Sequence, residues 1–599
     1  MKTNRNLHNI FIWLHHVICK YDKHLYLFIL LSAISNCISI IAVALIPKFL
    51  LSIIQQEQKF TSIMITLSVY GVILLVNGFL NNYTREYSEA KYMKIRLSII
   101  EENGEMFMKL PYSTIESSDF MDLCQKGHAA LRGSEQGFHA VLTNISLFCG
   151  HVLTCIISFL YVSSYASYLL GLIVIIVLIN RFIQYKQKER EKAIRDEMVS
   201  ENRQADYYYE VMSDFSYGKE IRMYSFADWV ERKLNTALSG IRSKKRIIYR
   251  NDLISGFILK GLVFIQENIV YLVFIIATLA GKIDIGSFLS YIGLITSFSV
   301  AFNSLLEDSV QIRYHSMFVQ DLIEYRKVLE TLIQENKKIE CQLDKSDWKI
   351  EFENVSFRYP NRKECALKNV SFTVEKGQKI ALIGLNGAGK TTIIKLMTRL
   401  YDVDEGRILF NHVDIRNIDR EQYYRLFAPM FQEVFLFAFS VSENIAMNYK
   451  DLVDREKVMR YLSDVKMVDQ VKALKNGLDT SCLKILDNEG CQFSGGEEQR
   501  FLLARTLYKD SDIFIFDEPT AALDPIIEDQ IYQEFNRFTY GKTTFYITHR
   551  LASTRFCDRI FVFSQGRLLE EGTHDELMAL KGEYCSLYEL QSKHYSVKC

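Results

Sequence analysis

A glycine-rich run at residues 384–392 has the composition of a site for nucleotide phosphates. Its pattern, G-x-x-x-x-G-K-T, follows an apolar run at 379–383 and precedes the helix-like run 392–397. In that strand–loop–helix context, backbone N–H groups close around phosphates, and the start of a helix favours an anion. The lysine can then reach the β- and γ-phosphates, and the threonine hydroxyl can hold Mg²⁺. The predicted nucleotide-binding residues of this run are Gly384, Asn386, Gly387, Ala388, Gly389, Lys390, Thr391 and Thr392.

A second group of residues suited to chemistry ends an apolar run. Residues 513–516 are Ile-Phe-Ile-Phe, and they lead directly into Asp517 and Glu518. A buried strand of this kind delivers both carboxylates to its end, where Asp517 and Thr391 are the predicted magnesium ligands. Glu518 is the predicted general base, because a carboxylate there can polarise the attacking water. An acidic pair at a strand end is common by chance, so its position relative to other motifs decides its meaning.

Length and composition restrict what the elements around these residues can be. A chain of 599 residues is too long for one hydrophobic core and suggests three or four domain-sized units. It carries 71 basic and 71 acidic residues, so no overall charge favours binding to nucleic acid. Its twelve cysteines are scattered without C-x-x-C spacing, so we predict neither a zinc site nor a disulfide framework.

The first half contains six apolar segments, each long enough to cross about 30 Å of hydrocarbon as a helix. They lie near 25–52, 62–82, 141–163, 166–185, 253–281 and 284–306. The long connections 84–140 and 186–252 are rich in lysine and arginine, whereas the short connections carry little beyond Lys59 and Lys282. The positive-inside rule therefore predicts that both long loops, both termini and the nucleotide domain are cytoplasmic. A soluble helical protein can also contain apolar helices, but six with this charge asymmetry make that alternative improbable.

The second half is soluble in character. From the alternating run 349–357 onwards, strand-like and helix-like patterns alternate, which predicts an α/β domain with a phosphate-binding loop. The predicted fold is therefore a six-span α-helical transmembrane domain followed by an α/β nucleotide-binding domain. Its predicted parts are an amphipathic segment at 1–24, the transmembrane domain at 25–325, a linker at 326–347, the nucleotide-binding domain at 348–585 and a tail at 586–599.

The run Phe493-Ser494-Gly495-Gly496-Glu497 narrows the interpretation of the phosphate loop. It precedes a helical run at 498–505, and backbone N–H groups at such a helix start can bind a γ-phosphate. This peptide is the mark of ATP-binding cassette proteins, and the whole chain resembles a bacterial exporter half-transporter of that superfamily. Phe493 stands where the family usually has leucine, and Glu497 where it commonly has glutamine. Neither departure suggests an inactive protein.

The resemblance gives further residues their expected roles. Tyr359 is expected to stack on adenine, Gln432 to sense Mg²⁺ and the attacking water, and His549 to contact the γ-phosphate. The peptide Ser494, Gly495, Gly496 and Glu497 is expected to engage ATP held by a second nucleotide domain, and Asp524 lies in the loop that crosses to that domain. The expected catalytic residues are Lys390, Gln432, Glu518 and His549, with Gln432 also near the metal. The cofactors are then ATP and Mg²⁺.

Because the chain contains one nucleotide domain, this resemblance implies that two chains associate, as a homodimer in the first instance. Short coupling helices near 112–123 and 214–229 are expected to dock on the nucleotide domains near Gln432. Mechanistically, ATP should close two nucleotide domains and hydrolysis should reopen them.

Clues to the substrate are weaker. The run 214–222, Asp-Phe-Ser-Tyr-Gly-Lys-Glu-Ile-Arg, resembles lantibiotic and peptide exporters. Lys260 and Glu267 lie seven residues apart in the fifth span, on nearly the same helix face, and ionisable groups within a bilayer usually face a bundle interior or a cavity. They either line the export path or form a structural pair or a helix break. The predicted function is ATP-driven export of a peptide across the bacterial cytoplasmic membrane. A lipid or amphipathic-drug exporter and an ATP-gated, channel-like member of the superfamily are the alternatives.

Overall fold

The computed structural model describes residues 2–55, 60–214, 217–336, 347–360, 362–432, 435–519, 535, 537–548 and 551–596. The chain forms two compact units. Unit 1 consists of Met1–Glu105 and Leu123–Arg326, and unit 2 consists of Met106–Asp122 and Lys327–Cys599. A short piece of the first long loop therefore folds with the C-terminal half of the chain.

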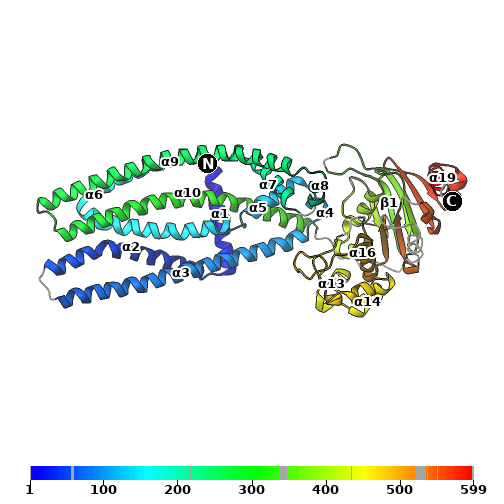
Figure 1. The fold of residues 1–599 in the computed structure, drawn as a ribbon, viewed down its shortest axis with the longest axis horizontal. Coiled ribbons are helices and arrows are strands. Elements are labelled where there is room, and N and C mark those ends of the chain that lie inside the picture. Colours follow the sequence, from blue (N-terminus) through cyan, green and yellow to red (C-terminus); the bar gives the residue numbers. More distant parts are fainter. Residues whose placement is uncertain are drawn as a thin grey trace. The chain divides into compact units, whose positions relative to one another are not determined.

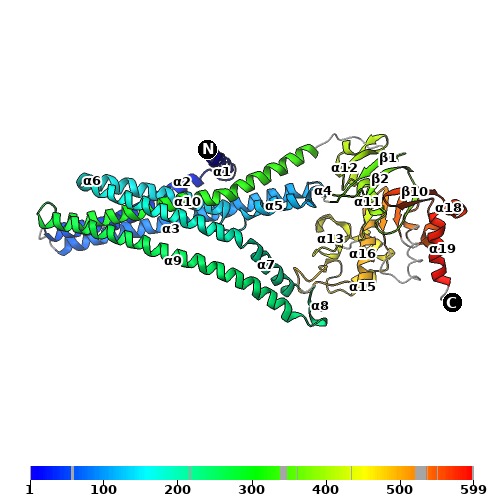
Figure 2. The same ribbon diagram turned by 90° about the horizontal axis from the view of Figure 1, so that it is seen from above.

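Unit 1 is built from long helices that run beside one another (Figure 1). Helix α2 packs along α6, and α9 packs along α6 and α7 (Figure 2). The helices that lie in this unit wholly or in large part are α1 (Lys2–Tyr21), α2 (Leu25–Gln55), α3 (Phe60–Met108), α5 (Ser118–Ala129), α6 (Gly137–Glu197), α7 (Val199–Ser213), α8 (Gly218–Met223), α9 (Ala227–Leu279) and α10 (Ile285–Asn336).

Five helices within the described residues are long and apolar enough to cross a membrane. Their stretches are Leu25–Leu51, Ile63–Met108, Gly137–Ser163, Ala227–Leu279 and Ile285–Gln334. The predicted fourth span, 166–185, coincides with a shorter apolar stretch at Gly171–Ile183, and both it and the predicted third span belong to α6. A helical membrane unit is thereby confirmed, whereas the count of six crossings stays a prediction.

Apolar side chains fill the interior of unit 1, as helices with apolar stripes require. One cluster joins Ala44 of α2, Val177 of α6, Phe274 of α9 and Phe298 of α10. Some polar side chains within the bundle pair with one another, and Gln266 Nε2 of α9 donates to the Ser299 hydroxyl of α10 at 2.7 Å. Pairing of this kind avoids the cost of an unsatisfied polar group in an apolar interior.

Unit 2 contains two sheets. The smaller sheet has the strand order β2-β1-β4-β5, with neighbouring strands antiparallel. The larger sheet has the order β10-β9-β3-β8-β7-β6, and all its pairs are parallel except β10 with β9. The strands are β1 (Lys349–Phe357), β2 (Leu367–Glu375), β3 (Lys379–Ile383), β4 (Glu405–Phe410), β5 (Val413–Asp414), β6 (Phe427–Met430), β7 (Ile513–Asp517), β8 (Thr543–Ile547), β9 (Arg559–Ser564) and β10 (Arg567–Gly572).

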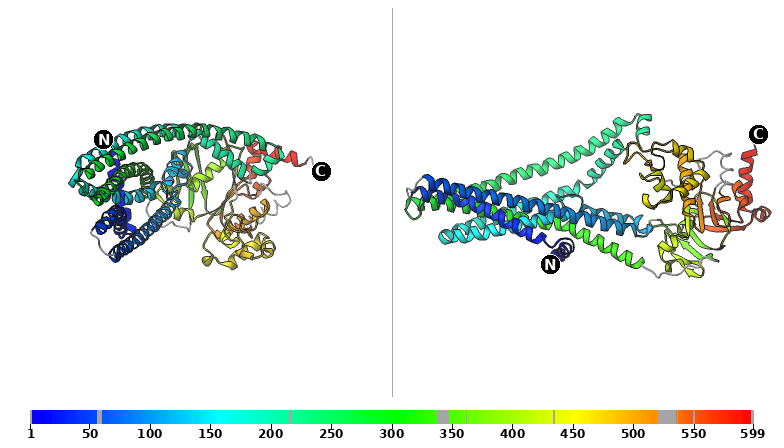
Figure 3. Two further views of the ribbon diagram at one scale, coloured as in Figure 1. Left: turned by 60° about the vertical axis from the view of Figure 1, so that its left-hand side comes forward. Right: turned by 90° about the horizontal axis from the view of Figure 1, so that it is seen from below.

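Two hydrophobic cores hold this unit together. The first lies between the two sheets and includes Trp348, Phe352 and Phe561. The second packs the other face of the larger sheet against helices and includes Phe501 and Phe514. The helices of unit 2 are α4 (Tyr112–Ile115), α11 (Lys390–Met397), α12 (Arg420–Tyr424), α13 (Val441–Ala446), α14 (Arg455–Asp464), α15 (Val468–Ala473), α16 (Gly495–Lys509), α18 (His574–Leu580) and α19 (Glu583–Ser596), the last drawn in red in Figure 3. The predicted α/β domain is thereby confirmed.

Candidate functional site

The glycine-rich loop connects the end of β3 to the start of α11, as its sequence predicted. Gly384 has φ 152° and Gly389 has φ 106°, a region that favours glycine. A Cβ atom on Gly384 would lie 2.2 Å from the carbonyl oxygen of Phe563, so a side chain cannot fit there. The two glycines therefore allow the backbone to form a tight loop at the start of a helix, where N–H groups point outwards.

Lys390 begins α11 and folds back over the loop. Its Nζ donates to the carbonyl oxygens of Gly384 at 2.7 Å and Leu385 at 3.1 Å. Burial lowers the pKa of this ammonium, while the charges of Glu518 and Asp517 oppose that shift. A buried cation held in the loop is placed to neutralise a phosphate.

The order of strands places the acidic pair beside the loop. In the larger sheet β8 alone separates β3 from β7, so the carboxyl ends of β3 and β7 lie at the same edge. Asp517 ends β7 with 3% of its surface exposed, and burial together with the charge of Glu518 raises its pKa to about 6. The side chain of Thr391 is close enough to Asp517 to oppose this shift in pKa. A hydroxyl and a buried carboxylate that share one spot are the oxygen ligands that Mg²⁺ accepts, so these residues fit the predicted metal.

Gln432 and Glu518 meet although 86 residues separate them in the chain. The amide Nε2 of Gln432 donates to Oε2 of Glu518 at 3.1 Å. Strands β6 and β7 are parallel neighbours with Met430 opposite Phe516, so residues two places further on lie side by side. Glu518 itself has φ 49°, a strained value for a residue with a side chain.

These residues line one pocket of about 1160 Å³. The predicted base end of the pocket is formed by Tyr359, whose hydroxyl hydrogen bonds with Thr392 Oγ1 at 3.1 Å. The described lining residues are Glu116, Tyr359, Pro360, Arg362, Lys363, Glu364, Cys365, Ala366, Asn386, Gly387, Ala388, Gly389, Lys390, Thr391, Thr392, Lys395, Gln432 and Glu518. The pocket is large enough for a nucleotide and carries cations where phosphates would lie.

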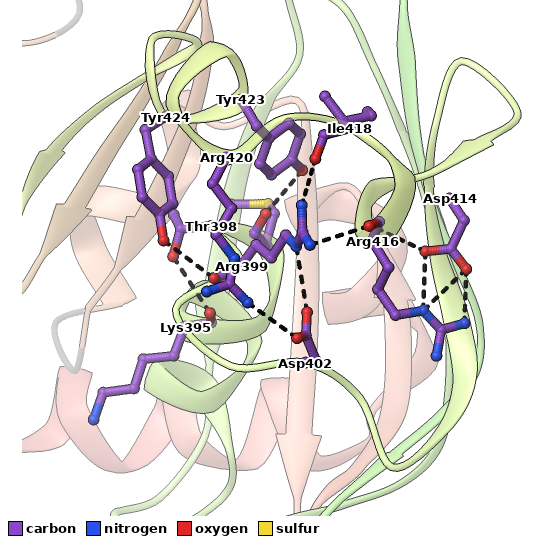
Figure 4. Close-up of polar contacts among 11 residues, drawn as sticks. Lys395, Thr398, Arg399, Asp402, Asp414, Arg416, Ile418, Arg420, Tyr423 and Tyr424 are labelled. Carbon is purple, nitrogen blue, oxygen red and sulfur yellow. Dashed lines mark hydrogen bonds and ion pairs between the residues drawn. The ribbon is translucent and has the colours of Figure 1, made fainter. Parts of the chain in front are cut away.

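Tyr401 packs against Tyr359 at this predicted base end. Its ring packs edge-on against Tyr359, with 5.3 Å between ring centroids, and Lys395 Nζ lies over both rings. Figure 4 shows the polar network that fixes the segment carrying Tyr401. There the buried Arg399 donates to the carbonyl oxygens of Ile418 and Arg416 and pairs with Asp402 at 3.3 Å.

Sequence reasoning did not identify Glu116, Lys395 or Tyr401. Lys395 lies four residues after Thr391 on α11, so the two share a helix face, and this spacing is the signal that indicates Lys395. Arg362 and Lys363 also line the pocket, and their closeness to Tyr359 in the sequence is the signal that indicates them. No local pattern points to Glu116 or Tyr401, because their place depends on packing between distant segments.

The peptide Ser494–Glu497 lies elsewhere in unit 2, at the start of α16. The backbone N–H and the hydroxyl of Ser494 both donate to Oε2 of Glu497, each at 2.8 Å. Hydrogen bonds from Ser494 lower the pKa of the Glu497 carboxyl, so it is charged at neutral pH. Neither Ser494 nor Glu497 is among the described residues that line the pocket.

Other predicted site residues are not brought together. Asp524 and His549 lie outside the described residues. In α9, Lys260 is exposed and Glu267 is half-buried, and no ion pair joins these two described side chains. Sequence reasoning also missed a partly buried pair in unit 1, His151 of α6 with Asp308 of α10, whose Nδ1 and Oδ2 atoms lie 2.7 Å apart.

Comparison with known proteins agrees with this geometry. Residues 367–521 match the family model described as ABC transporter. The chain is 30% identical to the subtilin transport ATP-binding protein of Bacillus subtilis, over 70% of this chain and 67% of that protein. It is 26% identical to the nisin transport ATP-binding protein of Lactococcus lactis subsp. lactis, over 94% and 92% of the two chains. An ATP-dependent lipid A-core flippase of Pasteurella multocida is 38% identical over 41% of each chain.

Among solved structures, a bacterial Atm1-family ABC exporter with ATP bound superposes with a TM-score of 0.76. The match covers 96% of this chain and 99% of that one at 21% identity, which shows a shared fold. The chain belongs to the ABC transporter family. Its class of activity is the hydrolysis of ATP coupled to transport across a membrane.

Proposed function

We propose that two copies of this chain form a homodimer that exports a peptide of the lantibiotic type from the cytoplasm. The observation that carries this proposal is the extent of the similarity to the nisin transport protein. A match over 94% of the chain includes the membrane unit, which must contact the cargo. The match to the Pasteurella flippase covers 245 residues, about the size of a nucleotide domain.

The nucleotide pocket supports a mechanism in which each ATP is completed by the second chain. Lys390 and Glu518 line one pocket, whereas Ser494 is exposed at the start of α16. In a dimer, that helix start would supply N–H donors to the γ-phosphate on the partner, as a helix N-terminus favours an anion. In this proposal Tyr359 stacks on the base, and Asp524 and His549 act at the interface and the γ-phosphate.

The proposal also includes a Mg²⁺ site and the side of the membrane on which the nucleotide domain lies. Thr391 and Asp517 would hold Mg²⁺, with Gln432 close to it, and the ion would neutralise charge on the transferred phosphoryl group. Glu518 would orient and deprotonate the attacking water while Gln432 holds its carboxylate.

The lysine- and arginine-rich loops support a cytoplasmic nucleotide domain, with both termini on the same side of the bacterial cytoplasmic membrane.

A transport assay tests the cargo. The full chain is reconstituted into liposomes, and the outward-facing nucleotide domains receive MgATP together with a fluorescent lantibiotic precursor peptide. We expect the peptide to accumulate inside the vesicles with ATP but not with ADP, and not in the Glu518→Gln variant. In parallel, a fluorescent phospholipid reports on flipping. Lipid translocation without peptide accumulation would replace the peptide proposal by the flippase alternative, and ATP-dependent ion leakage alone would favour the channel-like one.

A further inference from the structure

Residues 106–122 of the first long loop fold together with the nucleotide-binding half of the chain. The contact is specific: the ring of Tyr112 packs edge-on against that of Tyr401, with 5.7 Å between their centroids. Tyr401 in turn packs against Tyr359 at the base end of the nucleotide pocket. This segment therefore lies next to the pocket without belonging to the nucleotide domain in sequence.

Glu116 extends from the same short helical turn towards the pocket. It follows Tyr112 by four residues, and its backbone N–H donates to the Tyr112 carbonyl oxygen at 3.2 Å. Residues four apart on a helical turn share a face, so the contact of Tyr112 with Tyr401 directs Glu116 to the same side. Glu116 lines the pocket together with Tyr359 and Asn386. Its side chain is exposed and makes no hydrogen bond or ion pair with the described residues.

The charge of Glu116 indicates which part of a nucleotide it faces. Lys390 and the loop N–H groups mark the phosphate end of the pocket, whereas Glu116 belongs to the segment whose Tyr112 packs against Tyr401 beside Tyr359. Beside Tyr359 the ligand presents its nucleoside, whose hydroxyl groups are hydrogen-bond donors. A carboxylate accepts from two adjacent hydroxyls with good geometry, as acidic residues do for ribose in dinucleotide-binding folds.

We propose that Glu116 is a further nucleotide-binding residue, which accepts hydrogen bonds from the ribose hydroxyls of ATP held by the same chain. The first cytoplasmic loop, which continues directly into membrane helix α3, then contacts the nucleotide itself. Occupancy of the pocket would add a ligand-mediated bond between this loop and the nucleotide domain. The proposal concerns the nucleotide pocket and is independent of which cargo is exported.

Comparing the affinities of two nucleotides, with and without ribose hydroxyls, distinguishes a direct contact of Glu116 with the ribose from a general change in the pocket. The full-length protein is placed in lipid nanodiscs, and titration calorimetry measures the dissociation constants of ADP and 2′,3′-dideoxy-ADP. ADP avoids hydrolysis, and the dideoxy analogue lacks both proposed donors. We expect Glu116→Ala to weaken ADP binding about tenfold, the loss typical of a hydrogen bond to a charged group. The dideoxy analogue should bind the wild type and the variant with equal affinity.

Asp119→Ala is the matched control, because it removes the same charge from the same segment at an exposed position that does not line the pocket. Its affinity for both nucleotides should equal that of the wild type. Equal ADP affinity in the wild type and Glu116→Ala would overturn the proposal. An equal loss for ADP and the dideoxy analogue would overturn it too, since the lost contact would then not involve the ribose hydroxyls.

Discussion

The side-chain amide of Gln432 donates to the carboxylate of Glu518 at 3.1 Å across two neighbouring strand ends. The parallel register of β6 and β7 produces this contact. Met430 lies opposite Phe516, and Gln432 and Glu518 each follow two residues later along the chain. Gln432 is exposed, whereas Glu518 is half-buried at the pocket wall. The hydrogen bond therefore fixes the orientation of a carboxylate that faces the predicted position of the attacking water.

Glu518→Gln should preserve ATP binding and nearly abolish hydrolysis. The amide is of the same size and still bonds to Gln432, but it cannot accept a proton from water. General-base catalysis contributes about 10²- to 10⁴-fold, so kcat should fall by at least a hundredfold. Phosphate release by the reconstituted protein measures hydrolysis, and calorimetry measures ATP affinity. Wild-type turnover in this variant would remove Glu518 from the catalytic role.

Asp517→Asn should stabilise the protein in the absence of nucleotide and Mg²⁺. Burial raises the pKa of Asp517 from 3.8 to about 6, so between these values the folded state binds more protons than the unfolded state. The carboxyl therefore lowers stability as the pH rises through this window, by about 1 to 3 kcal/mol at neutral pH. The apparent Tm of Asp517→Asn should exceed that of the wild type at pH 7.5. The gain should shrink near pH 5.

The raised pKa of Asp517 also predicts how pH changes the Mg²⁺ concentration that hydrolysis requires. A proton and Mg²⁺ compete for the Asp517 carboxylate, so the concentration of Mg²⁺ that half-activates hydrolysis should rise as the pH falls below about 6. Asp517→Asn should hydrolyse ATP poorly at every Mg²⁺ concentration. A Mg²⁺ requirement that is constant from pH 5.5 to 7.5 would contradict this assignment.

Glu497→Gln should lower the KM for ATP. Both the N–H and the hydroxyl of Ser494 donate to the charged Glu497 carboxylate, which lies where the partner's γ-phosphate would approach in the proposed dimer. Removing a like charge from that position should lower the KM for ATP about three- to tenfold. Glu498→Gln, the adjacent position on α16, is the control. If both variants share the wild-type KM, the Glu497 charge does not face the nucleotide.

Asp308→Ala should destabilise the membrane unit. It leaves the partly buried His151 without the carboxylate that lies 2.7 Å away, and leaving a buried polar group without its partner costs about 1–3 kcal/mol. Replacing both residues by leucine should cost less than the single change, since no polar group is then left unpaired. Thermal unfolding in nanodiscs compares the three proteins. A double variant less stable than Asp308→Ala would show that the pair stabilises the bundle in its own right.

Local patterns predicted much of the fold correctly. The strand–loop–helix around Gly384–Lys390 and the apolar strand that ends at Asp517 each lie within a short window, so periodicity and glycine spacing are sufficient to find them. The apolar helices of unit 1 are recognised in the same way from length and hydropathy. The predicted spans 141–163 and 166–185 are not two separate helices, because both lie within α6.

The sequence alone determined the family, the order of a helical membrane unit and an α/β nucleotide domain, and the residue types at the phosphate loop. These features are local, since each motif carries its own chemistry and spacing. Only the tertiary structure decided that Gln432 bonds Glu518, that Glu116 lines the nucleotide pocket, that Tyr401 packs against Tyr359, and that Lys260 and Glu267 form no ion pair. Strand order, parallel register and the packing of distant aromatic rings decide those contacts, and none of them leaves a periodic signal in the chain.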